Sequence, residues 1–155
     1  MDSPPTVLVI GVGNEALKDE GIGIHAARVL AALDLPPSVR VLEGGTEGFS
    51  LVGRLEGVQR LVLVDAMAMD RPPGTVVTVR REQVRRRGQP DRSSLHGAGV
   101  LDALELAAAL GLAPPEVYIV GVQPAEVAWG LELSPLLQQA LPGVVEAVMR
   151  VVNPQ

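Results

Sequence analysis

Stretches of consecutive apolar residues alternate along the chain with stretches in which apolar residues recur every three or four positions. The first pattern predicts strands and the second predicts helices. The predicted strands are residues 6–11, 39–42, 61–65, 75–79 and 117–122. The predicted helices are residues 20–33, about 47–56, about 99–110 and 135 to about 151. This alternation predicts a single α/β domain over residues 1–155, with helices on both faces of a mostly parallel sheet.

Local signals refine this outline. The run 61–65 is apolar enough to form a central strand that is buried on both faces. Residues 75–79 follow a proline-rich turn and are predicted to form an antiparallel edge strand. Ser134-Pro135 fits a helix N-cap followed by a proline at the first helical position, whereas Pro142-Gly143 is expected to kink or interrupt that helix. The predicted architecture is a three-layer α/β/α domain with a twisted five-stranded sheet.

The composition excludes several classes of protein. The chain has three aromatic residues, Phe49, Tyr118 and Trp129, and no cysteine. It therefore lacks stacking platforms for single-stranded nucleic acid, a disulfide framework and a thiol nucleophile. No apolar run reaches the ~18 residues that a membrane span requires, and the first residues are not those of a basic signal peptide. We expect a cytoplasmic protein that binds neither nucleic acid nor membranes.

The net charge of −5 is unevenly distributed. Segment 80–92, which is predicted to be a loop, has six arginines and two acidic residues, so it carries +4 and the rest of the chain carries −9. A solvated sheet edge explains such a segment, because charge discourages edge-to-edge pairing. A docking patch for an acidic partner is the alternative. Nucleic acid comes third, because no aromatic residues accompany the arginines.

Two acidic residues follow the glycine-rich turn after the first predicted strand. A strand, a Gly-Val-Gly turn and a helix start are also the parts of a dinucleotide-binding fingerprint. Here, however, Asp19 and Glu20 occupy the helix start, where a phosphate would otherwise bind. Glu43 follows Gly11 by 32 residues, whereas a ribose-binding acid is expected after roughly 20. The loop is therefore predicted to bind a cation or a polarised peptide bond.

Three polar residues are expected to meet at one crevice. Glu20 begins the first helix, Asp65 ends the central strand, and His96 precedes the helix over 99–110. In open parallel sheets, ligands bind beyond the C-terminal strand ends, near the position where the strand order reverses. Individually, the three residues are explained by helix-dipole stabilisation, a loop cap and a hydrogen-bonded loop histidine. His25, the other histidine, is expected to pack or to lie at the surface.

Together, the three residues supply two carboxylates and an imidazole. This ligand set suits a divalent transition metal with open positions for water or substrate. Such a metal can polarise a carbonyl group or activate water. Without a metal, the two carboxylates can act as a general acid–base pair. The first interpretation uses all three residues and the second uses the two acids, and we predict Glu20, Asp65 and His96 as the catalytic residues.

Six sequence blocks, in this order, resemble those of the nickel–iron hydrogenase maturation endopeptidases. They are Gly11–Gly23 (GVGNEALKDEGIG), Gly44–Gly48 (GGTEG), Val64–Ala66 (VDA), Ser94–His96 (SLH), Val120–Pro124 (VGVQP) and Gly130–Pro135 (GLELSP). GxGN alone is a weak signal, but six collinear blocks between about residues 6 and 150 make a specific pattern. The resemblance implies a twisted five-stranded sheet between helices.

The resemblance also implies an endopeptidase, aspartyl-type or metal-assisted. Its substrate is the hydrogenase large-subunit precursor, from which it removes a short C-terminal extension once nickel has been inserted. The family's metal-contacting residues match Glu20, Asp65 and His96, which implies that these residues recognise nickel carried by the precursor. No permanent cofactor is then expected, although zinc, cadmium or nickel is expected to occupy the site in vitro.

Two alternatives belong to other functional classes. A non-catalytic nickel chaperone would use the same three residues, but histidine-rich tracts, which would favour it, are absent from the sequence. A Rossmann-like domain that binds a nucleotide or S-adenosylmethionine would use the Gly-Val-Gly turn. The acids at the helix start and the spacing to Glu43 argue against it.

Overall fold

The computed structural model describes residues 6–44, 48–86 and 98–154. Five strands of these residues form one sheet in the order β2–β1–β3–β5–β4. The strands are β1 (Val7–Val12), β2 (Val39–Gly44), β3 (Arg60–Ala66), β4 (Val76–Arg80) and β5 (Glu116–Val122). All neighbouring pairs are parallel except β4 and β5, which are antiparallel at one edge. The predicted mostly parallel sheet, with its antiparallel edge strand, is confirmed.

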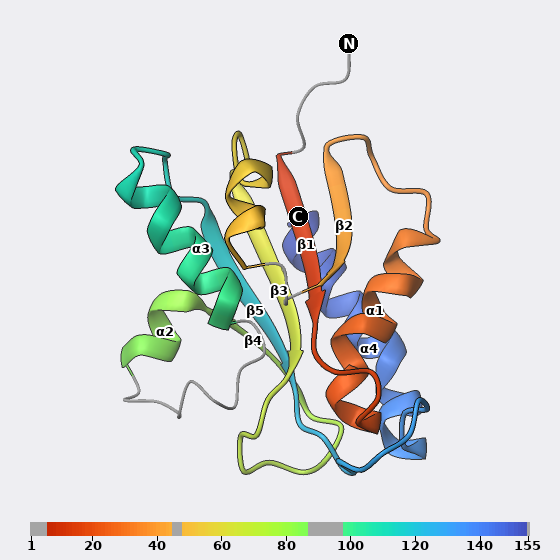
Figure 1. Cartoon of the computed structure of the whole chain (residues 1–155). Coiled ribbons are helices and arrows are strands. Elements are labelled where there is room, and N and C mark those ends of the chain that lie inside the picture. The colour runs from red at the N-terminus through yellow and green to blue at the C-terminus, as the bar shows by residue number, and fades with distance from the viewer. Residues whose placement is uncertain (1–5, 45–47, 87–97, 155) are drawn as a thin grey trace.

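Helices cover both faces of the sheet (Figure 1). On one face lie α1 (Ile22–Ala31), which follows the 3-10 turn η1 (Lys18–Gly21), and α4 (Pro135–Val152). On the other face lie the 3-10 helix η2 (Gly48–Arg54) and α3 (Ala98–Ala109). The short helix α2 (Arg81–Arg86) follows β4. This layering confirms the predicted α/β/α class. No helix within the described ranges is both long enough and apolar enough to cross a bilayer.

The central strand β3 is buried on both faces because its side chains alternate between two aliphatic cores. Val62 and Val64 pack with residues of α1 and α4, whereas Leu61 and Leu63 pack with residues of η2 and α3. A continuous apolar run is what two covered faces require of a strand. The carboxyl end of β3 is therefore held on a rigid platform, which suits the precise placement of a side chain there.

The last helix runs unbroken through Pro142, so the predicted interruption is wrong. Proline removes one backbone hydrogen bond and crowds the preceding turn. Here Pro142 and Gly143 lie on the exposed face of α4, where water can solvate the unpaired carbonyl, while Val144 and Val148 on the opposite face are fully buried. The inward packing holds the helix together. At its start, the Ser134 hydroxyl accepts a hydrogen bond from the Leu137 N–H, as a helix cap does.

The first residues after β4 are helical, so the predicted loop is wrong for residues 81–86. The Gln83 side chain accepts a hydrogen bond from the Arg80 N–H at 2.7 Å, and Arg81 pairs with Glu105 of α3 at 3.7 Å. Arg80 itself donates to the Tyr118 hydroxyl at 3.0 Å. These arginines therefore have intramolecular partners. Residues 87–92, the rest of the basic segment, lie outside the described residues.

Candidate functional site

The strand order reverses between β1 and β3, because the chain passes from β1 to β2 on one side and then crosses to β3 on the other. The carboxyl ends of these two strands are where a ligand is expected in such a sheet. Asp65, the second-last residue of β3, lies opposite Gly121 of β5 and is 1% exposed. At the same end, α1 begins so close to the strands that a Cβ at Gly23 would overlap the carbonyl oxygens of Val12 and Val64.

Gly13, just after β1, is the point at which Glu20 and Asp65 converge. Its φ of +137° belongs to a region that favours glycine. A Cβ at Gly13 would overlap the backbone carbonyl oxygen of Glu20 and would lie 3.8 Å from Oδ1 of Asp65. The next residue, Asn14, donates its N–H to the same Glu20 carbonyl at 3.2 Å. The loop thus brings the backbone carbonyl of the half-buried Glu20 and the Asp65 carboxylate to the same glycine.

His96, the third predicted site residue, lies outside the described residues. Within the described ranges, no group of three histidine, cysteine or acidic side chains is arranged to hold a metal ion. Of the three predicted ligands, Glu20 and Asp65 lie within the described residues. Carboxylate oxygens suit a divalent cation as part of a larger ligand set.

Asp19 has a different role from the one that its position beside Glu20 suggests. Its side chain is fully buried. Its Oδ2 accepts hydrogen bonds from the Ala125 N–H (2.9 Å), the Glu126 N–H (2.7 Å) and the Ser134 hydroxyl (2.7 Å), and its Oδ1 accepts one from the Ser134 N–H (2.8 Å). The prediction that both acids face an incoming ligand is therefore wrong for Asp19, which joins two distant segments.

The electrostatics of Asp19 fit this joining role. Burial alone would raise the pKa of the carboxyl group, but the hydrogen bonds from Glu126, Ser134 and Ala125 together outweigh burial and hold the pKa below its ordinary value. The group is therefore a carboxylate at neutral pH, and its charge is compensated by hydrogen-bond donors in place of a cation.

The loop between β5 and α4 lies directly against the site loop. Gly130 accepts a hydrogen bond from the Lys18 N–H at 2.9 Å and donates its own N–H to the Ala16 carbonyl at 2.9 Å. The Asp19 N–H donates to the Glu126 carbonyl at 3.2 Å. Hydrogen bonds thus hold the loop between β5 and α4 against Lys18 and Asp19, the two residues that precede Glu20.

Glu43, considered above as a ribose-binding acid, is occupied by an ion pair. Arg28 of α1 donates its Nε to Glu43 at 3.0 Å and both terminal nitrogens to Glu15 at 2.8 and 3.1 Å. The bond to Arg28 lowers the pKa of Glu15. These side chains link β2, α1 and the site loop, which weakens the nucleotide-binding interpretation. His25, on the same helix, is half-buried.

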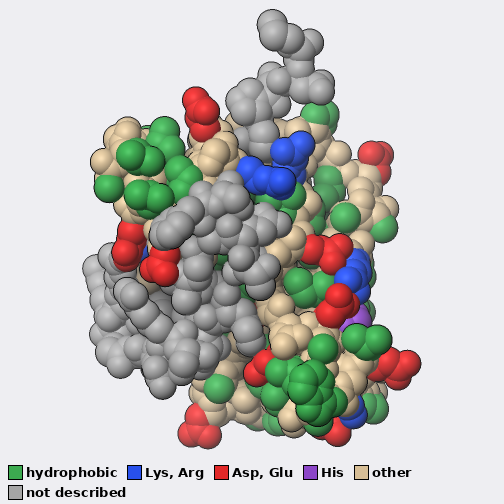
Figure 2. Space-filling view, viewed as in Figure 1, with side chains coloured by type: hydrophobic (Ala, Val, Ile, Leu, Met, Phe, Trp, Pro, Cys, Tyr) green, Lys and Arg blue, Asp and Glu red, His purple; other side chains and the backbone are tan. Residues whose placement is uncertain are grey.

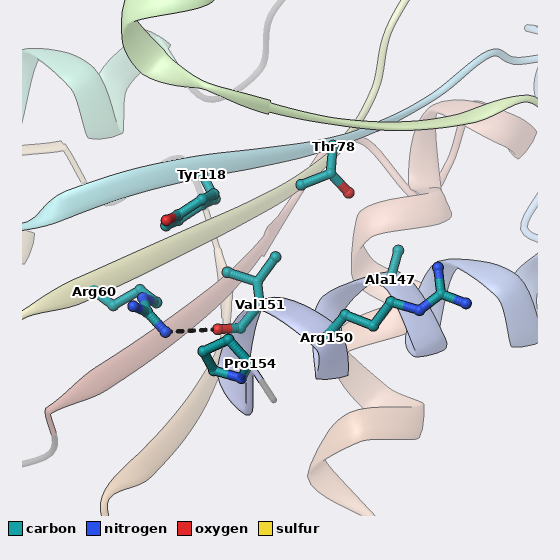
Figure 3. A pocket seen from close by; sticks show the side chains of 7 residues that line it. All are labelled: Arg60, Thr78, Tyr118, Ala147, Arg150, Val151 and Pro154. Carbon is teal, nitrogen blue, oxygen red and sulfur yellow. Dashed lines mark hydrogen bonds between the residues drawn. The ribbon is translucent and has the colours of Figure 1, made fainter.

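A pocket of about 340 Å³ lies far from this site, between α4 and the sheet (Figure 3). Its lining includes Arg60, the first residue of β3, which donates to the Val151 carbonyl at 2.8 Å. Asp65 lies at the other end of the same strand. The lining residues are Arg60, Thr78, Tyr118, Ala147, Arg150, Val151 and Pro154. The pocket and the candidate site are therefore separate features.

Gly13→Ala is expected to lower the free energy of unfolding by about 1–3 kcal/mol, the usual cost of a strained backbone, because the new methyl group meets the Glu20 carbonyl. Denaturant unfolding measures this change. Gly143→Ala is the matched control: that glycine is exposed inside α4 with no atom within 4 Å of a new Cβ. We expect it to raise stability by about 0.5–1 kcal/mol. Equal stability of the two variants would contradict the close approach at Gly13.

Comparisons with known proteins identify the family. The family model for hydrogenase maturation protease matches residues 24–151. A hydrogenase expression/formation protein of Thiocapsa roseopersicina is 36% identical over 96% of this chain and 68% of its own length. Another, from Azotobacter chroococcum mcd 1, is 40% identical over 81% of this chain, and the matched part is 60% of its length.

Solved structures show the same fold. The hydrogenase maturating endopeptidase HybD from Escherichia coli superposes with a TM-score of 0.83 at 31% identity, over 94% of this chain and 91% of that chain. The [NiFe] hydrogenase maturation protease HybD from Thermococcus kodakarensis gives a TM-score of 0.78 at 33% identity, over 93% and 97%. The match to the family model over residues 24–151 and the shared fold show that the chain belongs to the hydrogenase maturation protease family.

Proposed function

We propose that this protein is an endopeptidase that removes the C-terminal extension of a nickel–iron hydrogenase large-subunit precursor and recognises the nickel that the precursor carries. Family membership supports the peptidase activity. The observation that supports the site assignment is the approach of the Glu20 backbone and the Asp65 carboxylate to Gly13, at the reversal point of the sheet. We propose Glu20, Asp65 and His96 as the catalytic and nickel-contacting residues.

In this proposal the nickel ion is part of the substrate. Two carboxylates and an imidazole supply a partial ligand set, and the precursor supplies the remaining ligands. Because the ion is bound to both proteins, it fixes the nearby peptide bond beside the carboxylates. Binding energy from a group remote from the scissile bond can be used in this way for positioning.

The reaction is the hydrolysis of one peptide bond. Water adds to the carbonyl carbon, the C–N bond breaks, and the leaving nitrogen takes up a proton. A carboxylate at the strand ends can accept the proton of the attacking water and return it to the amine. In a metal-assisted route the ion lowers the pKa of the water. Both routes place Glu20 and Asp65 beside the reacting atoms.

Cleavage is expected for nickel-loaded precursor and not for nickel-free precursor, because only the loaded form offers the ion. Side-by-side incubations followed by mass spectrometry measure the loss of the extension. Casein and a free peptide spanning the cleavage site are the controls, and we expect both to remain uncut. Efficient cleavage of nickel-free precursor would contradict nickel recognition while leaving the peptidase assignment in place.

The same incubations test the chaperone alternative, and a melting-temperature measurement tests the nucleotide-binding alternative. A nickel chaperone would bind nickel and leave the precursor mass unchanged. A nucleotide-binding domain would show a raised melting temperature with added nucleotide or S-adenosylmethionine. The ion pair between Arg28 and Glu43 argues against the second alternative, because the acid that it requires already has a partner.

A further inference from the structure

The loop between β5 and α4 exposes a row of large apolar side chains. The exposed fractions are 53% for Val127, 82% for Trp129 and 67% for Leu131. Trp129 is the only tryptophan of the chain. Figure 2 shows hydrophobic side chains gathered at the end of the molecule where this loop lies, with acidic side chains around them. We call Val127, Trp129 and Leu131 the apolar ridge.

The backbone beneath the apolar ridge is fixed on both sides. Gly130 exchanges two hydrogen bonds with the segment around Lys18, and the buried Asp19 carboxylate holds the loop at Glu126 and Ser134. The exposure of these side chains therefore belongs to a well-anchored loop. Rigid aromatic side chains are typical of the few residues that dominate binding energy at protein interfaces, because little entropy is lost when they bind.

The apolar ridge begins beside the candidate site. The Glu126 carbonyl is bonded to the N–H of Asp19, the residue before Glu20. Three further residues reach Trp129, a span of at most about 11 Å for an extended chain. A polypeptide bound with its scissile bond at Glu20 would reach the apolar ridge within a few residues.

Size and charge decide which occupant fits. Three side chains are far fewer than the roughly 20–30 residues that each partner contributes to a standard stable interface, so the apolar ridge suits a short segment more than a second copy. Exposed Glu132 flanks it on one side, exposed Glu126 on the other side pairs with Lys18 at 3.6 Å, and the chain as a whole is acidic, with a net charge of −5. A second copy would bring like charge, whereas a segment with lysine or arginine beside its apolar residues would be attracted.

We propose that the apolar ridge binds an apolar segment of the precursor, carrying lysine or arginine, that flanks the scissile bond. This inference rests on the proposed function. Asp19 is then a positioning residue, since it holds the apolar ridge in register with Glu20. Specificity for the precursor is thereby divided between the nickel ion and a second contact on the polypeptide.

The test compares Trp129→Ala and Leu131→Ala with Leu110→Ala. Leu110 follows α3 and is 66% exposed, almost the same as the 67% of Leu131, so it is a matched control. With nickel-loaded precursor as substrate, we expect KM to rise about tenfold or more for the two variants of the apolar ridge, with a smaller change in kcat. We expect kcat/KM of Leu110→Ala to stay within about twofold of the parent.

A direct binding measurement separates docking from catalysis. Because Trp129 is the only tryptophan, protein labelled with 5-fluorotryptophan gives one fluorine NMR resonance. We expect nickel-loaded precursor to shift or broaden it. An unmoved resonance, unchanged KM in both variants, or a parent dimer that becomes a monomer in Trp129→Ala would each overturn the proposal. If the resonance moves but no precursor is cut, the docking surface stands and the proposed peptidase function fails.

Discussion

Glu20→Gln and Asp65→Asn are each expected to reduce cleavage of nickel-loaded precursor by about 10³-fold or more, a loss typical for the removal of a group that contacts the reacting atoms. Both substitutions keep the shape of the side chain and remove its negative charge. Glutamine and asparagine are poor metal ligands and cannot take up the proton of an attacking water. We expect the same loss for His96→Ala.

The fold should survive these substitutions. Glu20 is half-buried, and asparagine fills nearly the same volume as the almost fully buried Asp65, so the packing around β3 is kept even if a polar contact of the carboxylate is weakened. Melting temperatures within a few degrees of the parent, measured beside cleavage rates, would separate a chemical effect from unfolding. Glu146→Gln is the matched control for Glu20→Gln, because Glu146 lies on the outer face of α4 and pairs with Arg150. Full cleavage by Glu20→Gln or Asp65→Asn would show that the substituted residue is not part of the catalytic site.

Asp19→Asn is expected to lower the free energy of unfolding by about 2–4 kcal/mol, the order of magnitude for a buried charged acceptor that loses several hydrogen bonds. The amide replaces one carboxylate oxygen by an N–H₂ group. That group would face N–H and O–H donors of Ala125, Glu126 or Ser134. Two donors cannot satisfy each other, so the substitution both removes attraction and adds repulsion.

The effect of Asp19 depends on pH in a defined direction. Because the folded-state pKa is lower than the unfolded value, near 4 for aspartate, the folded state favours the carboxylate. The contribution of the Asp19 carboxylate to the free energy of unfolding is complete above the pKa of the unfolded state and is lost as the pH falls through the pKa of the folded state. The difference in unfolding free energy between parent and Asp19→Asn should therefore shrink in that acidic range.

Denaturant unfolding from about pH 7 down to about pH 2 measures this difference. Asp34→Asn is the control, because Asp34 is exposed after α1. We expect the control to change stability by no more than about 0.5 kcal/mol, as surface substitutions usually do. A loss for Asp19→Asn no larger than that of the control would show that the four hydrogen bonds contribute little.

The fold could be predicted because the strongest signals in this sequence are aliphatic. A continuous apolar run such as 61–65 is stable as a central strand of a sheet that is covered on both faces. The proline-rich turn before Val76 favours an edge strand. Local rules failed where packing or a single side chain decided the outcome. Pro142 is tolerated because its ring faces solvent, and residues 81–86 form a helix with help from Gln83 and the pairing of Arg81 with Glu105.

The site was less accessible to sequence reasoning. Asp19 and Glu20 are neighbours of similar charge, and a pattern of residue types does not tell which one turns inward. The signal that could have distinguished them is distant: Ser134 begins a helix and has donors to spare for a buried carboxylate. The apolar ridge was also missed, because an exposed tryptophan cannot be recognised until the backbone that holds it is known.

The bonds of Asp19 also set the order in which a newly made chain can become complete. Its partners lie 106 to 115 residues further along the sequence. During translation the glycine-rich loop and its acids leave the ribosome long before the segment that fixes them. A nascent chain ending before Ala125 has Glu20 and Asp65 but none of the four donors of the Asp19 carboxylate, and α4, which helps to close the core, has not yet been made. The site can therefore form only after nearly the whole polypeptide has been synthesised.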